Sequence, residues 1–356
     1  MLIDSDIAMP LSQKNIAKIK EELDNCKNPL FFFDDDPDGL CSFLLCYKYV
    51  QEGKGTVVKA RPRIDETFLR KVEEFQPDKI FVLDVVQVDQ EFIDKAGVPV
   101  VWIDHHEPQE RKGVRYFNPR IENPDDGTPV TYHCYKAVDD FLWLGMIGCV
   151  SDWHIPDFAE EFASKYPGLF STDITDPGKA IFDSPLSRLI MIFRFSLKGK
   201  TSDVMKCAKI LTRIDDPYEL LNEDSPRARF VTRYYKKINR EFEKTLNLAL
   251  AEFRKQEDRK INVFHYSEKR ISLTKDLSDK LLSMFPDKVI IIARDSDDEM
   301  KVSLRSPEGI DIASVLEEVL VGIEGYGGGH PHASGACIKK HDWNEFLRRI
   351  EEQCLK

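Results

Sequence analysis

Apolar strands that end directly in acidic residues constrain the fold of this chain more than any other feature. The apolar run 30–33 is predicted to be a short buried strand. It leads straight into the turn Asp34-Asp35-Asp36-Pro37-Asp38-Gly39 and an apolar helical segment at 40–50. The same alternation continues with strands at 56–60, 79–84 and 98–103 and helices at 66–75 and 90–95. It predicts a parallel sheet with helices on both faces, in which ligands bind beyond the carboxyl ends of the strands.

The rest of the chain divides into a helical part and a second α/β part. Helices are predicted at 11–25, 185–197, 202–214 and 225–256, and from 119 to about 259 the chain is mainly helical. Strand and helix alternation then resumes, with strands at 261–265, 288–293, 300–304 and 333–339, helices at 273–284, 310–320 and 343–355, and a glycine-rich turn at 325–329. A chain of 356 residues is longer than a domain with a single hydrophobic core usually is. We therefore predict an α/β protein with a parallel-sheet domain and helical extension (1–224), a connecting helix (225–260) and a smaller α/β domain (261–356).

Composition excludes several classes of protein. Hydrophobic residues make up 42% and charged residues 32% of the chain, which is ordinary globular composition and excludes disorder as the main state. There are 51 basic and 62 acidic residues, giving a formal net charge of −11. This balance excludes a polybasic protein held to nucleic acid mainly by counterion release, but it leaves room for a local basic surface.

The sequence predicts a soluble, cytoplasmic protein with no membrane association. Its longest apolar stretches, such as 141–150, are about half of the roughly 20 residues that a spanning helix needs. The first ten residues contain Asp4 and Asp6 and no long apolar run, so they do not resemble a secretory signal. The eight cysteines are scattered without a C-x-x-C pair and are predicted to be reduced.

Carboxylate and imidazole side chains follow several of the predicted strands. These residues are Asp34, Asp36 and Asp38 after the first strand, Asp84 after the third, Asp104, His105 and His106 after the fourth, and Asp152 after the apolar run 142–150. Each aspartate alone could be an ordinary helix N-cap, but that explanation has to be invoked separately at every position. Together they predict one site, where a divalent cation would relieve the repulsion. Oxygen and nitrogen ligands without thiolate suit Mn²⁺ or Mg²⁺, and the number of ligands suits a two-metal site for phosphoryl hydrolysis.

In order and spacing, these residues resemble the four motifs of the DHH phosphoesterases. The matching segments are Asp34-x-Asp36-x-Asp38-Gly39, Asp84, Asp104-His105-His106 and Gly148-x-x-x-Asp152. The segment from Gly327 to Gly335 resembles the glycine-rich signature of the family's C-terminal DHHA1 domain. Asp34 stands where many members that act on small substrates have histidine, as in RecJ-like nucleases. Val86 stands where the second motif often has glycine.

The resemblance implies a role for each matching residue. Asp34, Asp36 and Asp84 would hold one Mn²⁺, with Mg²⁺ as an alternative. The second ion would be held by Asp38, Asp84, His105 and Asp152, with Asp84 bridging the two. Asp104 would orient the neighbouring imidazoles, and His106 would face the scissile phosphate. In the DHHA1 domain, the substrate phosphate would be bound by Gly327, Gly328, Gly329, His330 and Arg305.

The predicted connecting helix has a local excess of positive charge. Residues 225–260 contain eleven Lys and Arg against five Asp and Glu. Phe230, Tyr234 and Tyr235 are interleaved with these charges, a mixture that can bind a single strand by charge and stacking. The alternative is an ordinary solvated helix face. In RecJ-like nucleases the cleft between the two domains takes the strand, which favours the binding interpretation.

The sequence therefore predicts a Mn²⁺-dependent single-strand-specific exonuclease of the RecJ-like branch, acting on DNA or RNA. One alternative is a phosphoesterase for short oligonucleotides (nanoRNA) or 3′-phosphoadenosine 5′-phosphate. Another is a catalytically inactive scaffold in a replication or repair assembly, whose partners would be replication or repair proteins. Proteins that have lost activity normally also lose their metal-binding residues. Here every predicted ligand position still holds Asp or His.

Overall fold

The structure, a computed structural model, describes residues 11–59, 63–267 and 271–354. It divides into two compact units, residues 1–235 and 236–356, and the division falls within the long helix α12 (Pro226–Arg254). This helix lies inside the segment predicted to connect the domains. The predicted domain limits themselves remain a prediction, and each unit is described here by itself.

A five-stranded parallel sheet forms the centre of the first unit, as the sequence predicts. Its strand order is β2 (Lys54–Val58), β1 (Pro29–Asp34), β4 (Lys79–Leu83), β6 (Val100–Ile103) and β7 (Val114–Phe117). All four neighbouring pairs are parallel. The edge strand β7 was not predicted, because its short Val-Arg-Tyr-Phe sequence lacks a continuous apolar run. Two further short strands, β3 (Arg63–Ile64) and β5 (Gln87–Val88), also pair in parallel.

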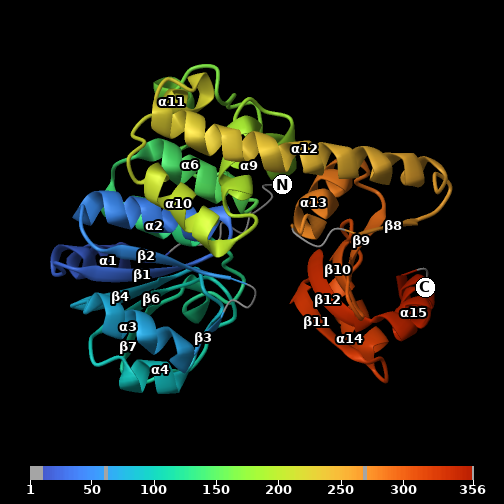
Figure 1. The fold of residues 1–356 in the computed structure, drawn as a ribbon, viewed down its shortest axis with the longest axis horizontal. Helices are drawn as coiled ribbons and strands as arrows, with labels where there is room; N and C mark the ends of the chain where they lie inside the picture. The colour runs from blue at the N-terminus through green and yellow to red at the C-terminus, as the bar shows by residue number, and fades with distance from the viewer. Residues whose placement is uncertain (1–10, 60–62, 268–270, 355–356) are drawn as a thin grey trace, which may run out of the picture. The chain divides into compact units, whose positions relative to one another are not determined.

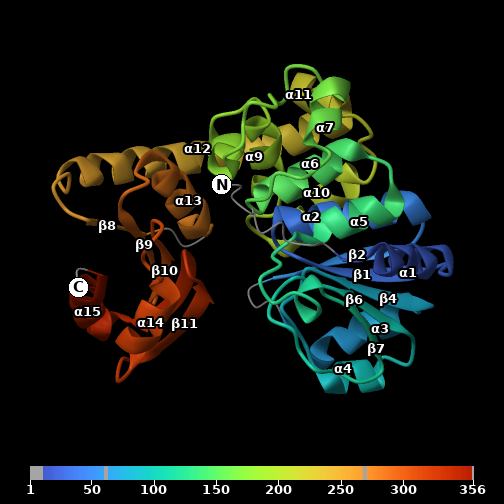
Figure 2. The ribbon, with the colours of Figure 1, turned by 180° about the vertical axis from the view of Figure 1, so that it is seen from behind.

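Residues of β1 alternate between two hydrophobic cores, one on each face of the sheet. Phe31 and Phe33 pack into the larger core, and Leu30 and Phe32 pack into the smaller one. The larger core lies under α1 (Gln13–Asp24), α2 (Pro37–Val50), α5 (Val130–Val138) and α6 (Leu142–Ser151). The smaller core lies against the 3₁₀ turn η1 (Glu66–Phe68), α3 (Leu69–Phe75) and α4 (Gln90–Lys95). Both faces are therefore covered by helices, as the two opposite views show (Figure 1, Figure 2).

Helices also make up the extension that follows the sheet. They are α7 (Ala159–Lys165), α8 (Pro177–Phe182), α9 (Ser187–Ser196), α10 (Thr201–Leu211), α11 (Pro217–Asn222) and the first part of α12. Their apolar side chains, including Phe162, Ile181, Leu189 and Val204, join the larger core of the sheet. The extension is thus part of the first unit's core, and none of the described helices is long and apolar enough to span a membrane.

The second unit contains a mixed five-stranded sheet. Its order is β11 (Gly325–His330), β12 (Ala333–Lys339), β10 (Glu299–Arg305), β9 (Val289–Ser296) and β8 (Ile261–Ser267). Only β8 and β9 pair in parallel; the other neighbouring pairs are antiparallel. Helices α14 (Ile312–Leu320) and α15 (Trp343–Cys354) share a core with the sheet, and α13 (Thr274–Met284) contacts β9 and β10. The unit is a smaller α/β domain, as predicted.

The glycine-rich segment is a strand, so its prediction as a turn is wrong. Glycine lets β11 approach β12 more closely than residues with a side chain could. A Cβ on Gly325 would lie 2.5 Å from the Cys337 carbonyl oxygen, and one on Gly327 would lie 2.8 Å from the Gly335 carbonyl oxygen. These contacts are shorter than any Cβ tolerates, so the glycines serve close strand pairing here and not only turn flexibility.

The contact between α5 and α6 yields a stability prediction at Gly148. A Cβ at this position would lie 2.2 Å from Thr131 Oγ1 and 2.7 Å from Thr131 Cβ, so the two helices would have to separate. We expect Gly148→Ala to lower the free energy of unfolding by about 1–3 kcal/mol and the Tm by roughly 2–10 °C. Gly328→Ala is the matched control, since nothing lies within 4 Å of its Cβ. Equal melting temperatures for the two variants in a calorimetric scan would contradict the prediction.

Candidate metal centre

Three neighbouring strands bring the predicted ligands to one edge of the parallel sheet. Strands β1, β4 and β6 are adjacent, and all run in the same direction. Asp34 is the last residue of β1, Asp84 follows β4, and His105 and His106 follow β6. Side chains from different parts of the chain therefore meet because the carboxyl ends of parallel strands lie at one edge.

The structure places these side chains in three overlapping groups that could hold a metal ion. Within each group the ligand atoms lie within 4.8 Å of one another. The groups are Asp34, Asp36 and Asp84; Asp38, His105 and Asp152; and Asp84, His105 and His106. Asp84 and His105 each belong to two groups, so the three groups form one continuous site.

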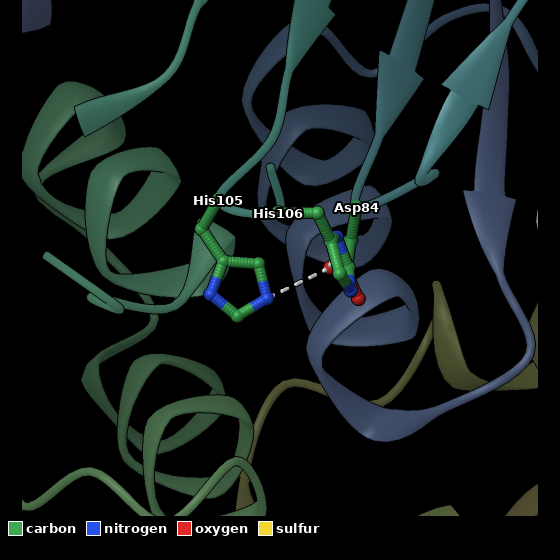
Figure 3. Close-up of side chains that lie close together, drawn as sticks. All are labelled: Asp84, His105 and His106. Carbon is green, nitrogen blue, oxygen red and sulfur yellow. Dashed lines mark ion pairs between the residues drawn. The ribbon is translucent and has the colours of Figure 1, made fainter. Parts of the chain in front are cut away.

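Asp84 lies at the centre of this site and is almost completely buried, with 2% of its surface exposed. Its Oδ1 accepts no hydrogen bond from the described residues; it lies 3.3 Å from His105 Nε2 and 3.9 Å from His106 Nδ1 (Figure 3). An unsatisfied buried carboxylate oxygen is costly unless a cation binds it. The backbone of Asp84 is left-handed, with φ of 60°. Aspartate tolerates this conformation, and Val86 is not among the residues with a positive φ.

The first motif is shaped by close packing of helix α2 against the end of β1. A Cβ on Gly39 would lie 2.6 Å from the Asp34 amide nitrogen, so only glycine fits at this position. Asp36 is the N-cap of α2, and its Oδ1 accepts hydrogen bonds from the amides of Asp38 and Gly39 at 3.0 and 3.2 Å. Asp36 is thus both a helix cap and a member of a potential metal-binding group, and the two explanations do not exclude each other here.

A backbone carbonyl fixes the orientation of His105. Its Nδ1 lies 3.2 Å from the Gly127 carbonyl oxygen, which can only accept a hydrogen bond. With the proton on Nδ1, the lone pair on Nε2 points toward Asp84 Oδ1 at 3.3 Å and Asp152 Oδ2 at 3.7 Å. This is the arrangement in which histidine binds a metal, with a hydrogen bond at the opposite nitrogen setting the tautomer.

Asp104 orients only one of the two imidazoles. Its Oδ1 lies 2.8 Å from His106 Nδ1, and the carboxylate is fully buried. The expectation that Asp104 orients both neighbouring rings is therefore not met at His105, which is held by Gly127. Asp104 Oδ2 lies 3.4 Å from the Tyr116 hydroxyl and 3.5 Å from Asn118 Nδ2. The two rings need separate partners because they point in different directions, with an angle of 73° between their planes.

The N-terminus of helix α5 holds Asp38. The amides of Val130 and Thr131 donate to the two carboxylate oxygens of Asp38 at 2.9 and 2.7 Å. Thr131 Oγ1 also donates to the Asp38 carbonyl oxygen at 2.9 Å. Free amides at a helix N-terminus favour a negative charge. The sequence did not single out Val130 and Thr131, nor Tyr116, Asn118 and Gly127. The available signal for the start of α5 was Pro129, just before the helix.

Burial and nearby negative charges raise the pKa values of two carboxylates, Asp38 and Asp84, in the protein without metal. Burial, followed by the charge of Asp152, raises the pKa of Asp38 to about 7. Burial and the charges of Asp38 and Asp36 hold the pKa of Asp84 well above its usual value. Burial lowers the pKa of His105, but its contacts with Asp84 and Asp152 outweigh burial and leave it raised. A bound cation would offset the cost of burying these negative charges together, so the site favours cation binding.

The donor set fits Mn²⁺ or Mg²⁺. The three groups consist of carboxylate oxygens and imidazole nitrogens, and none of them contains a thiolate. The unsatisfied Oδ1 of Asp84 lies where two of the groups meet. Hard oxygen ligands with some imidazole suit these ions. Two of the groups consist of residues of the two predicted ligand sets, whereas the third contains His106, which was predicted to face the phosphate. The assignment of individual ligands remains a prediction.

Loss of the Thr131 hydroxyl is expected to weaken metal binding. Thr131→Val keeps the shape of the side chain but removes the hydrogen bonds to the Asp38 carbonyl oxygen and to Ser42 Oγ, the latter 3.2 Å long. Residues that orient metal ligands typically contribute 10–100-fold to affinity, so we expect a weakening of about 10-fold or more in Mn²⁺ titration calorimetry. Thr131→Ser retains the hydroxyl and should bind nearly as well as the unmodified protein. Unchanged affinity in Thr131→Val would show that the hydroxyl does not position Asp38.

In the second unit, Arg305 is buried and already engaged. Its Nε donates to Asp279 Oδ1 at 2.7 Å, and its Nη1 donates to the Leu304 carbonyl oxygen at 2.8 Å. Only 7% of its surface is exposed. The guanidinium is therefore held in one orientation by its own domain, and its predicted contact with a substrate phosphate remains a prediction.

The glycine-rich strand β11 is the exposed edge of the second sheet. Gly327, Gly328, Gly329 and His330 are all exposed, and β11 pairs with β12 on one side only. Within the described residues, no other strand pairs with its outer edge. An unpaired strand edge presents backbone N–H groups to solvent, and glycine allows a ligand to approach them closely. Their role in binding phosphate remains a prediction.

Three aromatic residues of α12 are engaged in packing contacts. The Tyr234 hydroxyl donates to the Lys198 carbonyl oxygen at 2.6 Å, and the ring of Tyr235 stacks on Phe195 with centroids 6.0 Å apart. Phe230 lies under the Lys206 ammonium, 4.5 Å from its ring centroid. All three side chains are half-buried, so these contacts favour packing over stacking on nucleobases, which remains a prediction. The basic residues do remain exposed, including Arg233, Lys236, Lys237, Arg240 and Lys244.

Comparison with known families and structures agrees with this fold. The model of the DHH family, N-terminal domain, matches residues 30–146, and the model of the DHHA1 domain matches residues 272–356. No curated protein matched the sequence. A structure of RecJ from Thermus thermophilus in complex with Mn²⁺ aligns with 96% of this chain at 14% identity and a TM-score of 0.64. The aligned part is 54% of that protein, so the chain spans about half of its length.

Two further structures have the same fold at comparable identity. A structure of the exonuclease RecJ bound to manganese aligns over 98% of this chain and 96% of its own, with 15% identity and a TM-score of 0.53. An exopolyphosphatase-related protein from Bacteroides fragilis aligns over 96% of both chains, with 14% identity and a TM-score of 0.53. At this identity the likeness concerns the fold alone. Since the two family models together match more than half of the sequence, the chain belongs to the DHH/DHHA1 phosphoesterase superfamily.

Proposed function

We propose that this protein is a Mn²⁺-dependent phosphodiester hydrolase, a RecJ-like exonuclease that removes nucleotides from an end of single-stranded DNA or RNA. The observation that carries the proposal is the shared position of Asp84, whose unsatisfied Oδ1 lies between two groups of ligands at one sheet edge. A carboxylate shared by two ligand groups would help to hold two cations, which in phosphoryl hydrolysis stabilise the attacking and leaving oxygens. The RecJ structures with this fold are described in complex with Mn²⁺ or Mg²⁺, which supports the choice of ion.

The residues around the site would have different roles in hydrolysis. Two divalent ions would supply an activated water and stabilise the negative charge that develops on the phosphate. Asp34, Asp36, Asp38, Asp84, His105 and Asp152 would hold them. The Nδ1 of His106 is bonded to Asp104 at 2.8 Å, so His106 would meet the scissile phosphate through Nε2. The buried carboxylate of Asp104 would keep that ring in place as charge develops.

The second unit would contribute groups that bind a phosphate of the substrate. Strand β11 offers exposed backbone amides at Gly327, Gly328 and Gly329 and the imidazole of His330. A guanidinium held by Asp279, as in Arg305, is preorganised and would lose little side-chain entropy on meeting a phosphate. The exposed basic residues of α12 would add nonspecific attraction for the phosphate backbone, and this attraction should weaken as salt is raised.

A phosphoesterase for short oligonucleotides or 3′-phosphoadenosine 5′-phosphate is the second candidate. It is favoured by the packing of Phe230, Tyr234 and Tyr235 within the first unit, since α12 then offers a long strand charge but less aromatic surface for stacking. Without stacking, each additional nucleotide contributes less to binding. The two candidates use the same metal centre and differ in how the rate depends on chain length.

A product ladder tests the proposal and separates the two candidates. The protein with Mn²⁺ is given 5′-labelled single strands of DNA and of RNA, from two to about 40 nucleotides long, with a duplex of each length for comparison. An exonuclease should shorten long single strands stepwise and leave the duplexes intact. A rate that falls steeply beyond a few nucleotides would replace the exonuclease by the short-oligonucleotide enzyme. Asp38→Ala is the inactive control; cleavage by this variant at the same rate would point to a contaminating nuclease.

The same experiment addresses a role as an inactive scaffold with replication or repair proteins as partners. No cleavage of any strand by a protein that binds Mn²⁺ in calorimetry would overturn the catalytic proposal and favour the scaffold. Every predicted ligand is present and the ligand groups are formed, which favours activity.

A further inference from the structure

Two aromatic side chains are exposed in this chain, and both lie beside predicted functional residues. The sequence contains 22 Phe, 11 Tyr and four Trp, and all lie in the described part of the chain. Of these, only Trp153 and Tyr326 are exposed, with 41% and 65% of their surfaces accessible. Trp153 follows the predicted ligand Asp152 directly, and Tyr326 lies in the glycine-rich strand β11. A single exposed aromatic side chain is common on a protein surface. What distinguishes Trp153 is its position directly after a predicted metal ligand.

The backbone at Trp153 is held in an unfavourable conformation. Its φ is 59°, in the left-handed region that bulky residues rarely adopt. Hydrogen bonds fix the chain on both sides: the Trp153 amide donates to the Val150 carbonyl oxygen at 3.1 Å, and the His154 amide donates to the Cys149 carbonyl oxygen at 3.0 Å. The end of α6 therefore places Asp152 and Trp153 as a rigid pair, even though this arrangement costs conformational energy.

Helix α8 fixes the indole from one side. A Cβ on Gly178 would lie 3.2 Å from Trp153 Cζ3, so the ring rests against a glycine. Phe182 meets the indole edge to face, with centroids 6.3 Å apart and planes at 65°. Phe182 is itself covered by the guanidinium of Arg194, which is 5.8 Å from its centroid. The indole is thus supported by packing while a large part of its surface stays accessible, as a preorganised binding surface requires.

We propose that Trp153 is a stacking surface for a nucleobase of the substrate, so that this metal centre selects nucleotides over phosphate chains that carry no base. The inference rests on the proposed phosphodiester hydrolase function and adds the group that recognises the base. A base is joined to its phosphate through one sugar, and Trp153 directly follows the predicted metal ligand Asp152 in the chain. In this proposal one nucleotide contacts both residues. Stacking depends little on which base is present, which suits an enzyme that degrades strands of any sequence.

Substrates with an abasic residue test this assignment directly. Trinucleotides are prepared with a tetrahydrofuran abasic unit at each position in turn, and kcat/KM is measured with Mn²⁺ for the unmodified protein and for Trp153→Ala. Base stacking on an aromatic side chain is worth about 5- to 150-fold. We expect Trp153→Ala to lose a factor in this range on the complete trinucleotide. We also expect one abasic position at which the two proteins become equal, because the stacking partner is then missing in both.

Each outcome of this comparison between the two proteins and the complete and abasic trinucleotides supports or overturns the proposal. If Trp153→Ala cleaves the complete trinucleotide as fast as the unmodified protein, the stacking surface is wrong while the hydrolase stands. The same holds if the variant is slowed equally on all substrates, abasic ones included, since Trp153 would then act through the metal site. If the unmodified protein cleaves no oligonucleotide, the proposed function itself fails. Met284→Ala is the control, because Met284 is exposed to a similar extent, 43%, and lies outside the predicted site.

A binding measurement provides a readout besides activity. Trp102 and Trp143 are fully buried, and Trp343 stacks on Phe346, so Trp153 is the tryptophan with the most accessible ring. A dinucleotide with a non-hydrolysable phosphonate linkage should quench the fluorescence of the unmodified protein, and the quenching should be lost in Trp153→Phe. That variant keeps an aromatic ring and should retain most of the activity, which also shows that it folds. Quenching that persists unchanged in Trp153→Phe would overturn the assignment.

Discussion

Replacing Asp84 with asparagine is expected to lower kcat on single-stranded oligonucleotides by about 10³-fold or more, equivalent to about 4 kcal/mol. Asparagine has the same shape but no charge, and only one of its two terminal atoms can bind a cation. Asp84 belongs to two of the three ligand groups, so a single substitution affects both proposed metal positions. Activity with saturating Mn²⁺ and the number of bound ions in titration calorimetry would both report the loss.

Asp35→Asn is the matched control for this substitution. Asp35 lies in the same acidic turn, but it belongs to none of the three ligand groups, and its carboxylate is 4.0 Å from Lys59 Nζ. We expect this variant to stay within about threefold of the unmodified protein, as is usual for exposed charges. If Asp84→Asn kept more than a tenth of the activity and still bound two ions, the central role of Asp84 would be refuted.

The second large effect is a loss of Mn²⁺ affinity as the pH falls. Without metal, the pKa of Asp38 is about 7, so at pH 5 only about one protein in a hundred has this carboxylate ionised. Protons then compete with the cation, and the apparent Mn²⁺ affinity should fall by about 100-fold from pH 8 to pH 5. The raised pKa values of Asp84 and His105 act in the same direction.

Calorimetric titrations at pH 5, 6, 7 and 8, in buffers with different ionisation enthalpies, would measure both the affinity and the protons released. Asp38→Asn should bind Mn²⁺ more weakly at pH 8 but show a shallower pH dependence, because its side chain no longer titrates. An affinity that stayed constant within about threefold over this range would contradict the raised pKa of Asp38.

The shifted pKa values of Asp38 and His133 affect the pH dependence of the folding stability in opposite directions. The raised pKa of Asp38 means that the folded protein without metal binds more protons than the unfolded chain between about pH 4 and 7, so it loses stability as the pH rises. Burial lowers the pKa of His133 to about 3, so this group gains stability as the pH rises to about 6.5. The stabilisation added by Mn²⁺ is the clearer measure, since His133 belongs to no ligand group. It should grow from pH 5 to pH 8.

Much of the fold and the site could be predicted because the signals are local. The run 30–33 followed by acidic residues predicted a buried strand, and strands of this kind recur at regular intervals. Parallel strands place their carboxyl ends at one edge of the sheet. The proximity of Asp34, Asp84 and His105 could therefore be predicted without knowledge of the packing. The structure confirms the parallel sheet and places these residues in the overlapping groups.

One local pattern can be compatible with two environments. The glycines at 325–329 fit a turn as well as a strand that pairs closely with its neighbour. The aromatic residues of α12 recur at helical spacing, which suits a core-facing stripe as well as a binding surface; Tyr235 stacks on Phe195 and Tyr234 bonds to Lys198. Sequence alone gives the spacing but not the partner on the other side.

The sequence by itself determined the order of strands and acids and, from these, the kind of site that the chain can form. Only the tertiary structure decided which groups hold the ligands in place: the amides of Val130 and Thr131 at Asp38, and the Gly127 carbonyl at His105. It also decided that Trp153 is exposed while Phe230, Tyr234 and Tyr235 of α12 are half-buried. The physical reason is that strand and helix periodicity acts over a few residues, whereas Asp38 and Thr131 are 93 positions apart and meet only through packing.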